Sequence, residues 1–138
     1  MSVPPADRHV IRRTVGYADL NELGGLSTPV ALRWIEEAAR AHAEAVGVGA
    51  PRMLEERTMV VVRQHAMHLH HPARTGDVLE IETRVMEAGG PRAVRQNEVR
   101  RALDGRVLLT CRTEWVWIDP QTGRPRRLGR PFVEAYGF

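Results

Sequence analysis

The sequence predicts an α+β fold in which a five-stranded antiparallel sheet curls around one long central helix. An alanine-rich helical segment follows a single strand-like segment, and four further strand-like segments come after it. The gaps between those four segments are turn signals, so successive strands are expected to be antiparallel. The 138 residues suffice for one hydrophobic core, and we therefore expect a single domain over residues 1–138.

The first half of the chain supplies one strand and the central helix. Residues 10–17 (VIRRTVGY) are the expected first strand, and a Gly-bearing loop follows them. Thr28 and Pro29 predict the helix start, because a hydroxyl can cap a helix and Pro is tolerated at its first position. Gly47 and Gly49 predict its end. Charged residues occupy one arc of the helix, so most of it is expected to be buried, and its alanines keep it thin enough for a sheet to wrap.

The second half is expected to be a short helical turn followed by four strands. The turn is predicted over residues 52–56, and the strands over residues 59–70, 78–86, 92–103 and 106–118. The connecting turns are predicted at Gly76-Asp77, at Gly89-Gly90-Pro91, at Asp104-Gly105 as a two-residue hairpin, and from Asp119 to Gly123.

Composition narrows the class of protein. Hydrophobic residues make up 43% and charged residues 27%, which are ordinary globular values, and the formal charge is +3. This modest basic excess favours an anionic ligand, but aromatic residues are only 5% and Lys is absent, which argues against a nucleic-acid binder. No long apolar stretch and no secretion signal are visible, so we expect a cytoplasmic protein without membrane contact. Cys111 is the only cysteine, which excludes an internal disulfide.

Four local sequences, in this order, carry a resemblance to a known family. They are residues 17–21 (YADLN) with Gly24 close behind, residues 32–38 (LRWIEEA), residues 72–79 (PARTGDVL) and residues 119–125 (DPQTGRP). Together they resemble the hotdog-fold acyl-CoA thioesterases related to 4-hydroxybenzoyl-CoA thioesterase. The resemblance implies hydrolysis of an acyl-CoA or acyl-carrier thioester without a cofactor. It also implies a homodimer or homotetramer with active sites at the subunit interface.

The loop after the first strand departs from the family pattern. The resemblance implies a catalytic aspartate where this chain has Asn21, and an amide cannot act as a nucleophile or base. Asn21 can instead hold a water or the substrate carbonyl, or it is simply a turn residue. Asp19 matches the preceding acidic position and is either an acid-base group or, as we prefer, a structural carboxylate. The backbone amide that polarises the carbonyl falls near Thr28, where the helix dipole stabilises an oxyanion.

Two helix carboxylates are the candidates for the missing base. Thr28 and Glu36 have a spacing that resembles that of fluoroacetyl-CoA-type thioesterases, so Glu36 is preferred and Glu37 is the second choice. Either carboxylate can point into an interface cleft, where burial raises a carboxyl pKa. The alternative is a solvated series of (i, i+4) ion pairs between Arg33, Glu36, Glu37, Arg40 and Glu44.

Several other side chains invite a functional interpretation. Arg92, Arg95 and Arg124 can bind coenzyme A phosphates, or they are solvated surface residues. His42 lies on the apolar helix face and is expected to be a hydrogen-bonded core residue. His68 and His70 share a strand face, but their spacing lacks a metal signature, so no metal is expected.

Two classes of function remain open from the sequence. The first is a thioester hydrolase that uses Asn21, Thr28 and Glu36. The second is an acyl-CoA or acyl-carrier binding module of the same fold that has no catalytic activity.

Overall fold

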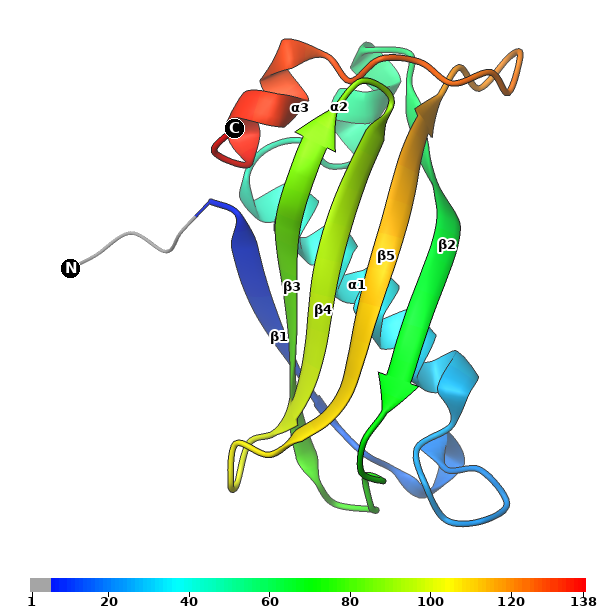
Figure 1. The fold of residues 1–138 in the computed structure, drawn as a ribbon, viewed down its shortest axis with the longest axis vertical. Helices are drawn as coiled ribbons and strands as arrows, with labels where there is room; N and C mark the ends of the chain where they lie inside the picture. Colours follow the sequence, from blue (N-terminus) through cyan, green and yellow to red (C-terminus); the bar gives the residue numbers. More distant parts are fainter. Residues whose placement is uncertain (1–5) are drawn as a thin grey trace, which may run out of the picture.

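The computed structural model describes residues 6–138 and contains one five-stranded antiparallel sheet with a long helix against one face (Figure 1). The strand order is β1-β3-β4-β5-β2. The strands are β1 (Arg8–Thr14), β2 (Met59–Leu69), β3 (Val78–Gly89), β4 (Arg92–Arg101) and β5 (Val107–Ile118). The helices are η1 (Tyr17–Asp19), α1 (Thr28–Ala45), α2 (Ala50–Glu55) and α3 (Arg130–Ala135). The predicted α+β class and the predicted sheet around a central helix are confirmed.

Helix α1 packs closely on the sheet because the side chains it buries are mostly small. Its buried residues are Ala31, Trp34, Ile35, Ala38, Ala39, His42 and Ala43. Alanine combines the highest helix propensity with the smallest side chain after glycine, so the sheet can approach the helix axis. The prediction that most of the helix is buried is only partly right, since Val30, Leu32 and Ala41 remain half-exposed in a single chain.

The inner face of the sheet carries two hydrophobic clusters with polar residues between them. Alternation along β3 and β5 turns every second side chain toward α1. One cluster includes Ile81 and Cys111, and the other includes Val85 and Trp115. Between them, at matching register, lies a buried polar band made of Thr83, Arg95, Asn97 and Thr113. The band separates the two hydrophobic clusters under α1, one of which packs against the first half of the helix and the other against its second half.

Some predicted boundaries are wrong for identifiable reasons. The first strand begins at Arg8 because Arg8 pairs with Arg84 of β3, and it ends before Gly16, whose N–H donates to the Asp19 carboxylate (2.8 Å). The Asp104-Gly105 turn is not a two-residue hairpin. The Arg101 N–H donates to the Arg106 carbonyl (2.9 Å), which closes a loop over residues 102–105.

Helix α3 is not among the elements that the sequence predicts. It starts after Gly129 with Pro at its first turn, the same signal that marks the start of α1. Its six residues are too few to show a helical period in the sequence. The helix buries Phe132, which joins the hydrophobic cluster around Trp117.

The two ends of the molecule differ in what covers them (Figure 1). The loop through η1 that leads into α1 lies at one end, and α2 and α3 lie together at the other. Within residues 6–138, no helix combines the length and the apolar composition that crossing a bilayer requires.

Candidate functional site

The loop between β1 and α1 is held in shape by its own backbone and by Asp19. The Asp19 carboxylate accepts the Gly16 N–H (2.8 Å), and its carbonyl accepts the Ser27 N–H (2.8 Å). Leu20 and Leu26 form an isolated antiparallel bridge that draws the two arms of the loop together. Asp19 thus makes the loop contacts that a structural carboxylate makes, and these contacts place the start of α1.

Asn21 is exposed and closes the tip of the same loop. Its side-chain oxygen accepts the N–H groups of Leu23 (2.9 Å) and Gly25 (3.1 Å). Because both partners are donors, the accepting atom must be the amide oxygen. The Asn21 Nδ2 group is therefore the part of this side chain that can donate a hydrogen bond to a ligand.

The start of α1 leaves backbone donors available. The side chain of the N-cap residue Ser27 makes no hydrogen bond to the first turn, and Pro29 has no N–H. Thr28 lines a small hollow of about 20 Å³, together with Leu26, Ala31, Met67, Leu69, His71, Ala73, Val99, Leu108 and Leu109. A hollow of this size holds about one water molecule. The positive end of the helix dipole faces the same region, so negative charge is stabilised there.

The two helix carboxylates have different surroundings. Glu37 accepts two hydrogen bonds from Arg13 of β1 (3.0 and 3.3 Å) and lies 3.8 Å from Arg33. Glu36 is half-buried and has no ion pair within residues 6–138. Of the ion pairs expected along the helix, the described chain forms only that of Arg33 with Glu37. The sequence did not reveal Arg13, since a contact between two elements leaves no local spacing.

The three candidate arginines do not form one cluster. Arg92 lies on the outer face of the sheet and contacts Glu114 (2.9 Å) and Glu87 (3.6 Å). Arg95 lies on the inner face and is only 5% exposed, so it cannot reach a phosphate at the surface. Arg124 is exposed in the loop after β5. Their positions therefore do not support the prediction that the three arginines bind the coenzyme A phosphates together. The burial of Arg95 contradicts its predicted contact with a phosphate.

The buried polar band is linked to α1 and α3 through Arg95. Its guanidinium donates to His42 Nδ1 (2.8 Å), to Thr83 Oγ1 (3.1 Å) and to the Tyr136 hydroxyl (3.1 Å). His42 Nε2 contacts the Ala6 carbonyl (2.7 Å), so His42 is the hydrogen-bonded core residue that the sequence predicts. Burial, and then the Arg95 charge, lower the pKa of His42 to about 4. Sequence reasoning missed Tyr136, because it also missed α3.

The strand histidines do not gather. His65 faces α1 and contacts Thr113 (2.8 Å), whereas His70 contacts Thr110 on the other face (3.1 Å). Within the described residues, no group of three or more His, Cys, Asp or Glu side chains is arranged to hold a metal ion.

Comparison with known proteins decides the family. The sequence profile of the thioesterase-like superfamily matches residues 15–134, which include the loop after β1, α1 and the rest of the sheet. The chain belongs to the thioesterase-like superfamily. No curated protein sequence matches it.

Solved thioesterase structures share the fold of this superfamily member. A 1,4-dihydroxy-2-naphthoyl-CoA thioesterase from Synechocystis is 18% identical, with a TM-score of 0.84 over 94% of this chain and 95% of that one. A DHNA-CoA thioesterase from Staphylococcus aureus is 20% identical, with a TM-score of 0.84 over 94% and 88%. A mutant of 4-hydroxybenzoyl-CoA thioesterase, solved with 4-hydroxybenzoyl-CoA, is 19% identical, with a TM-score of 0.85 over 95% and 99%. The fold is thus the hotdog fold.

Proposed function

We propose that this chain hydrolyses an acyl thioester, of coenzyme A or of an acyl carrier protein, to a free acid and a thiol. One observation carries the proposal. The uncapped start of α1 lies beside a small hollow in a chain that matches the thioesterase-like superfamily from residue 15 to residue 134. Backbone amides at a helix start are suited to an oxyanion, which is the charge that forms when water attacks a thioester carbonyl.

The start of α1 binds the thioester carbonyl oxygen. The Thr28 N–H donates to this oxygen, and the donation strengthens as negative charge develops on it. Loss of one such donor lowers kcat by about 10²–10³-fold in enzymes that use an oxyanion hole. Asn21 holds the attacking water through Nδ2, since its amide oxygen is already engaged by Leu23 and Gly25.

Glu36 is the base. Its carboxylate takes a proton from the attacking water, whose oxygen forms a bond to the thioester carbon. The tetrahedral intermediate then collapses, the C–S bond breaks, and the proton passes from Glu36 to the leaving thiolate. Glu36 suits this role better than Glu37, because Arg13 holds the Glu37 carboxylate in an ion pair.

The coenzyme A phosphates bind to a different subunit from the one whose Thr28 binds the thioester. The loop after β5, which contains Arg124, lies at the end of the molecule opposite the start of α1 (Figure 1). Within one chain it is therefore remote from Thr28. In a homodimer or homotetramer, Arg124 of one subunit contacts a ligand whose thioester lies at Thr28 of another.

Thiol release from aliphatic and aromatic acyl-CoA substrates tests the proposal. We expect turnover on at least one substrate, and a fall in kcat of about 10²-fold or more in Glu36→Gln. Glu37→Gln is the matched control, with the same change one position away, and it is expected to retain kcat within a few-fold. Full activity in Glu36→Gln would remove Glu36 from the mechanism.

The second candidate is the binding module without catalysis, and Asn21 is the observation that favours it. Where the family resemblance implies an aspartate, this side chain is an amide that closes its own loop. Saturable acyl-CoA binding with no thiol release on the whole substrate panel would support this candidate over the hydrolase.

A further inference from the structure

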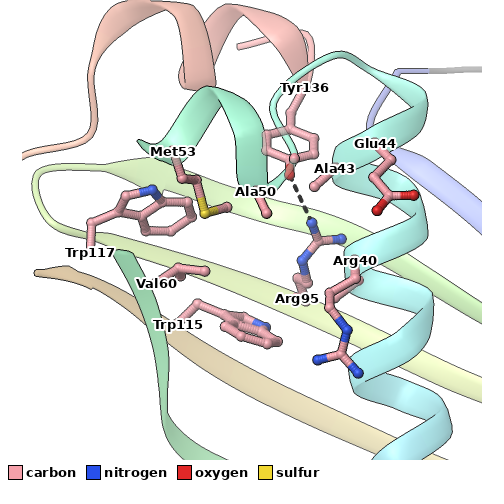
Figure 2. Close-up of a pocket in the computed structure, with 12 residues that line it drawn as sticks. Arg40, Ala43, Glu44, Ala50, Met53, Val60, Arg95, Trp115, Trp117 and Tyr136 are labelled. Carbon is pink, nitrogen blue, oxygen red and sulfur yellow. Dashed lines mark hydrogen bonds between the residues drawn. The ribbon is translucent and has the colours of Figure 1, made fainter. Parts of the chain in front are cut away.

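A second cavity lies at the opposite end of α1 from the proposed thioester site. It has a volume of about 180 Å³ and lies between the C-terminal half of α1, helices α2 and α3, and the sheet (Figure 2). Ala39 is the residue of its wall nearest to the start of α1, and it lies about 16 Å along the helix from Thr28. The cavity is therefore distinct from the hollow at Thr28.

The cavity wall includes a buried positive charge without a negative partner. Arg95 is 5% exposed, and its hydrogen-bond acceptors are His42, Thr83 and Tyr136. None of these is an anion, because the hydroxyls are neutral and His42 accepts through an unprotonated nitrogen. Arg95 forms no ion pair within residues 6–138, and residues 1–5 (MSVPP) contain no acidic side chain. A guanidinium stays protonated in proteins, so this charge is uncompensated.

Two buried tryptophans in the same wall have indole N–H groups without an acceptor. Trp115 is 8% exposed and Trp117 is 4% exposed, and neither indole Nε1 has a hydrogen-bond partner within the described chain. Buried polar groups in folded proteins are nearly always hydrogen-bonded, and an indole N–H can only donate. Both nitrogens are closed to solvent, so the two tryptophans present ring surface to the cavity, and Arg95 supplies the positive charge of its wall.

The rest of the wall is apolar. Figure 2 shows Arg95 between Trp115 and Tyr136, with Val60, Met53 and Trp117 continuing the wall away from it. Arg40 and Glu44 line the α1 side, and both side chains are exposed. Within the described residues, no ion pair joins the Glu44 carboxylate to Arg95. An inorganic anion alone would leave the apolar surfaces of the cavity in contact with water.

We propose that this cavity binds a small organic carboxylate, with the carboxylate on Arg95 and the apolar body against Trp115, Trp117 and Met53. The size fits a monocyclic aromatic acid or a short aliphatic acid, since an apolar cavity of about 150 Å³ accommodates benzene. A carboxylate supplies the negative charge that Arg95 lacks. Binding at this site does not require that the chain hydrolyse thioesters. The ligand is the free acid and not the thioester.

Side-chain indole NMR signals test the proposal directly. The chain has three tryptophans, and the third, Trp34, packs in the other hydrophobic cluster. Titration with benzoate is expected to shift the indole N–H signals of Trp115 and Trp117 in a saturable way and to leave that of Trp34 unchanged. Benzyl alcohol, which has the same ring and no charge, is expected to bind at least tenfold more weakly. Inorganic phosphate is expected to cause no saturable shift.

Three variants separate binding in the cavity from nonspecific effects. Arg95→Gln is expected to weaken benzoate binding at least tenfold, whereas Arg112→Gln, on the outer face of the sheet, is expected to leave it unchanged. Ala50→Phe keeps Arg95, Trp115 and Trp117 and places a larger side chain in the cavity wall, so it is expected to abolish binding even if Arg95→Gln fails to fold.

Three results would overturn the proposal. They are equal binding of benzoate and benzyl alcohol, equal shifts at all three tryptophans, and undiminished binding of benzoate to Ala50→Phe. None of these results bears on thiol release, so a failure here is distinguishable from a failure of the proposed hydrolase.

Discussion

A substitution at Asn21 can preserve the conformation of the loop between β1 and α1 and change the chemistry of its side chain. Its amide oxygen accepts two backbone N–H groups, and a carboxylate oxygen can accept the same two. Asn21→Asp should therefore preserve the loop while placing a carboxylate where the resemblance implies the catalytic aspartate. We expect this variant to release thiol from acyl-CoA at least tenfold faster than the wild type, measured as kcat on the best substrate of the panel.

Asn21→Ala is the control for that substitution, because it removes both loop hydrogen bonds and adds no charge. It is expected to destabilise the loop and to lower activity. If Asn21→Asp gained nothing and bound acyl-CoA as the wild type does, then a carboxylate at this position would not limit the reaction.

His42 should make stability depend on pH. Its pKa is about 4 in the folded chain, below its ordinary value of 6.5, first because of burial and second because of Arg95. Between these values the unfolded chain binds a proton that the folded chain excludes. The contribution of His42 to stability is thus fully present above about pH 6.5 and is lost as the pH falls toward 4, by up to about 3 kcal/mol. Urea denaturation at about pH 7 and about pH 4.5 measures this loss.

Two variants identify the group responsible for that pH dependence. His42→Gln has no ionisable group and is expected to flatten the loss between the two pH values. His9 stacks on His42, with ring centroids 5.8 Å apart, so His9→Gln serves as the matched control. This variant is expected to retain most of the loss of stability between the two pH values. An unchanged pH dependence in His42→Gln would exclude His42 as its source.

Among the helices and strands, α1 has a start that favours anion binding over helix stability. Ser27 is at the N-cap but its side chain does not cap the first turn. Ser27→Asp adds a negative charge near the positive end of the helix dipole, so we expect an unfolding free energy higher by about 0.5 kcal/mol. The same charge repels an oxyanion at Thr28, so kcat for thiol release should fall at least tenfold.

Ser27→Asn is the control for this prediction, because Asn has nearly the same shape and cap preference without the charge. It should give a similar gain in stability and a much smaller loss of kcat. A Ser27→Asp variant with wild-type kcat would argue against an oxyanion at the start of α1.

The long elements could be predicted from sequence, whereas of the short helices only α2 (Ala50–Glu55) was expected, as a turn over residues 52–56. Helix α1 and strands β2 to β5 each span enough residues to show their own periodicity, and their turns contain Gly, Pro and Asp. The three-residue η1 and the six-residue α3 are too short to show one. They form because of their contacts, such as the Asp19 bond to Gly16 and the burial of Phe132.

Across the molecule as a whole, exposed apolar side chains surround the start of α1. Leu23 is 96% exposed and Leu69 is 62% exposed, and Tyr17 of η1 is also exposed. Apolar groups gathered near a candidate site are typical of an interface. We therefore expect a homodimer or homotetramer in solution, measured by sedimentation equilibrium. Leu23→Asp should shift the assembly toward monomer and lower kcat together with it.

Leu54 provides the control for that substitution. It is 78% exposed on α2, which lies at the end of the molecule opposite the start of α1 (Figure 1), so Leu54→Asp changes an exposed leucine away from the candidate interface. It is expected to leave both assembly and kcat unchanged. A wild-type chain that is monomeric and fully active would contradict the interface.

Local patterns in the chain were enough to establish the class of fold, the long elements, the family resemblance and the buried state of His42. Each of these depends on residues close together in the sequence, whose spacing reports which face is apolar and where the backbone must turn. Packing was needed to show that Arg13 holds Glu37, that Arg95 is buried rather than available to phosphate, and that Arg95, Trp115 and Tyr136 meet at one cavity. Those contacts join different strands and helices, so the charge and burial of these side chains depend on neighbours that are distant in the sequence.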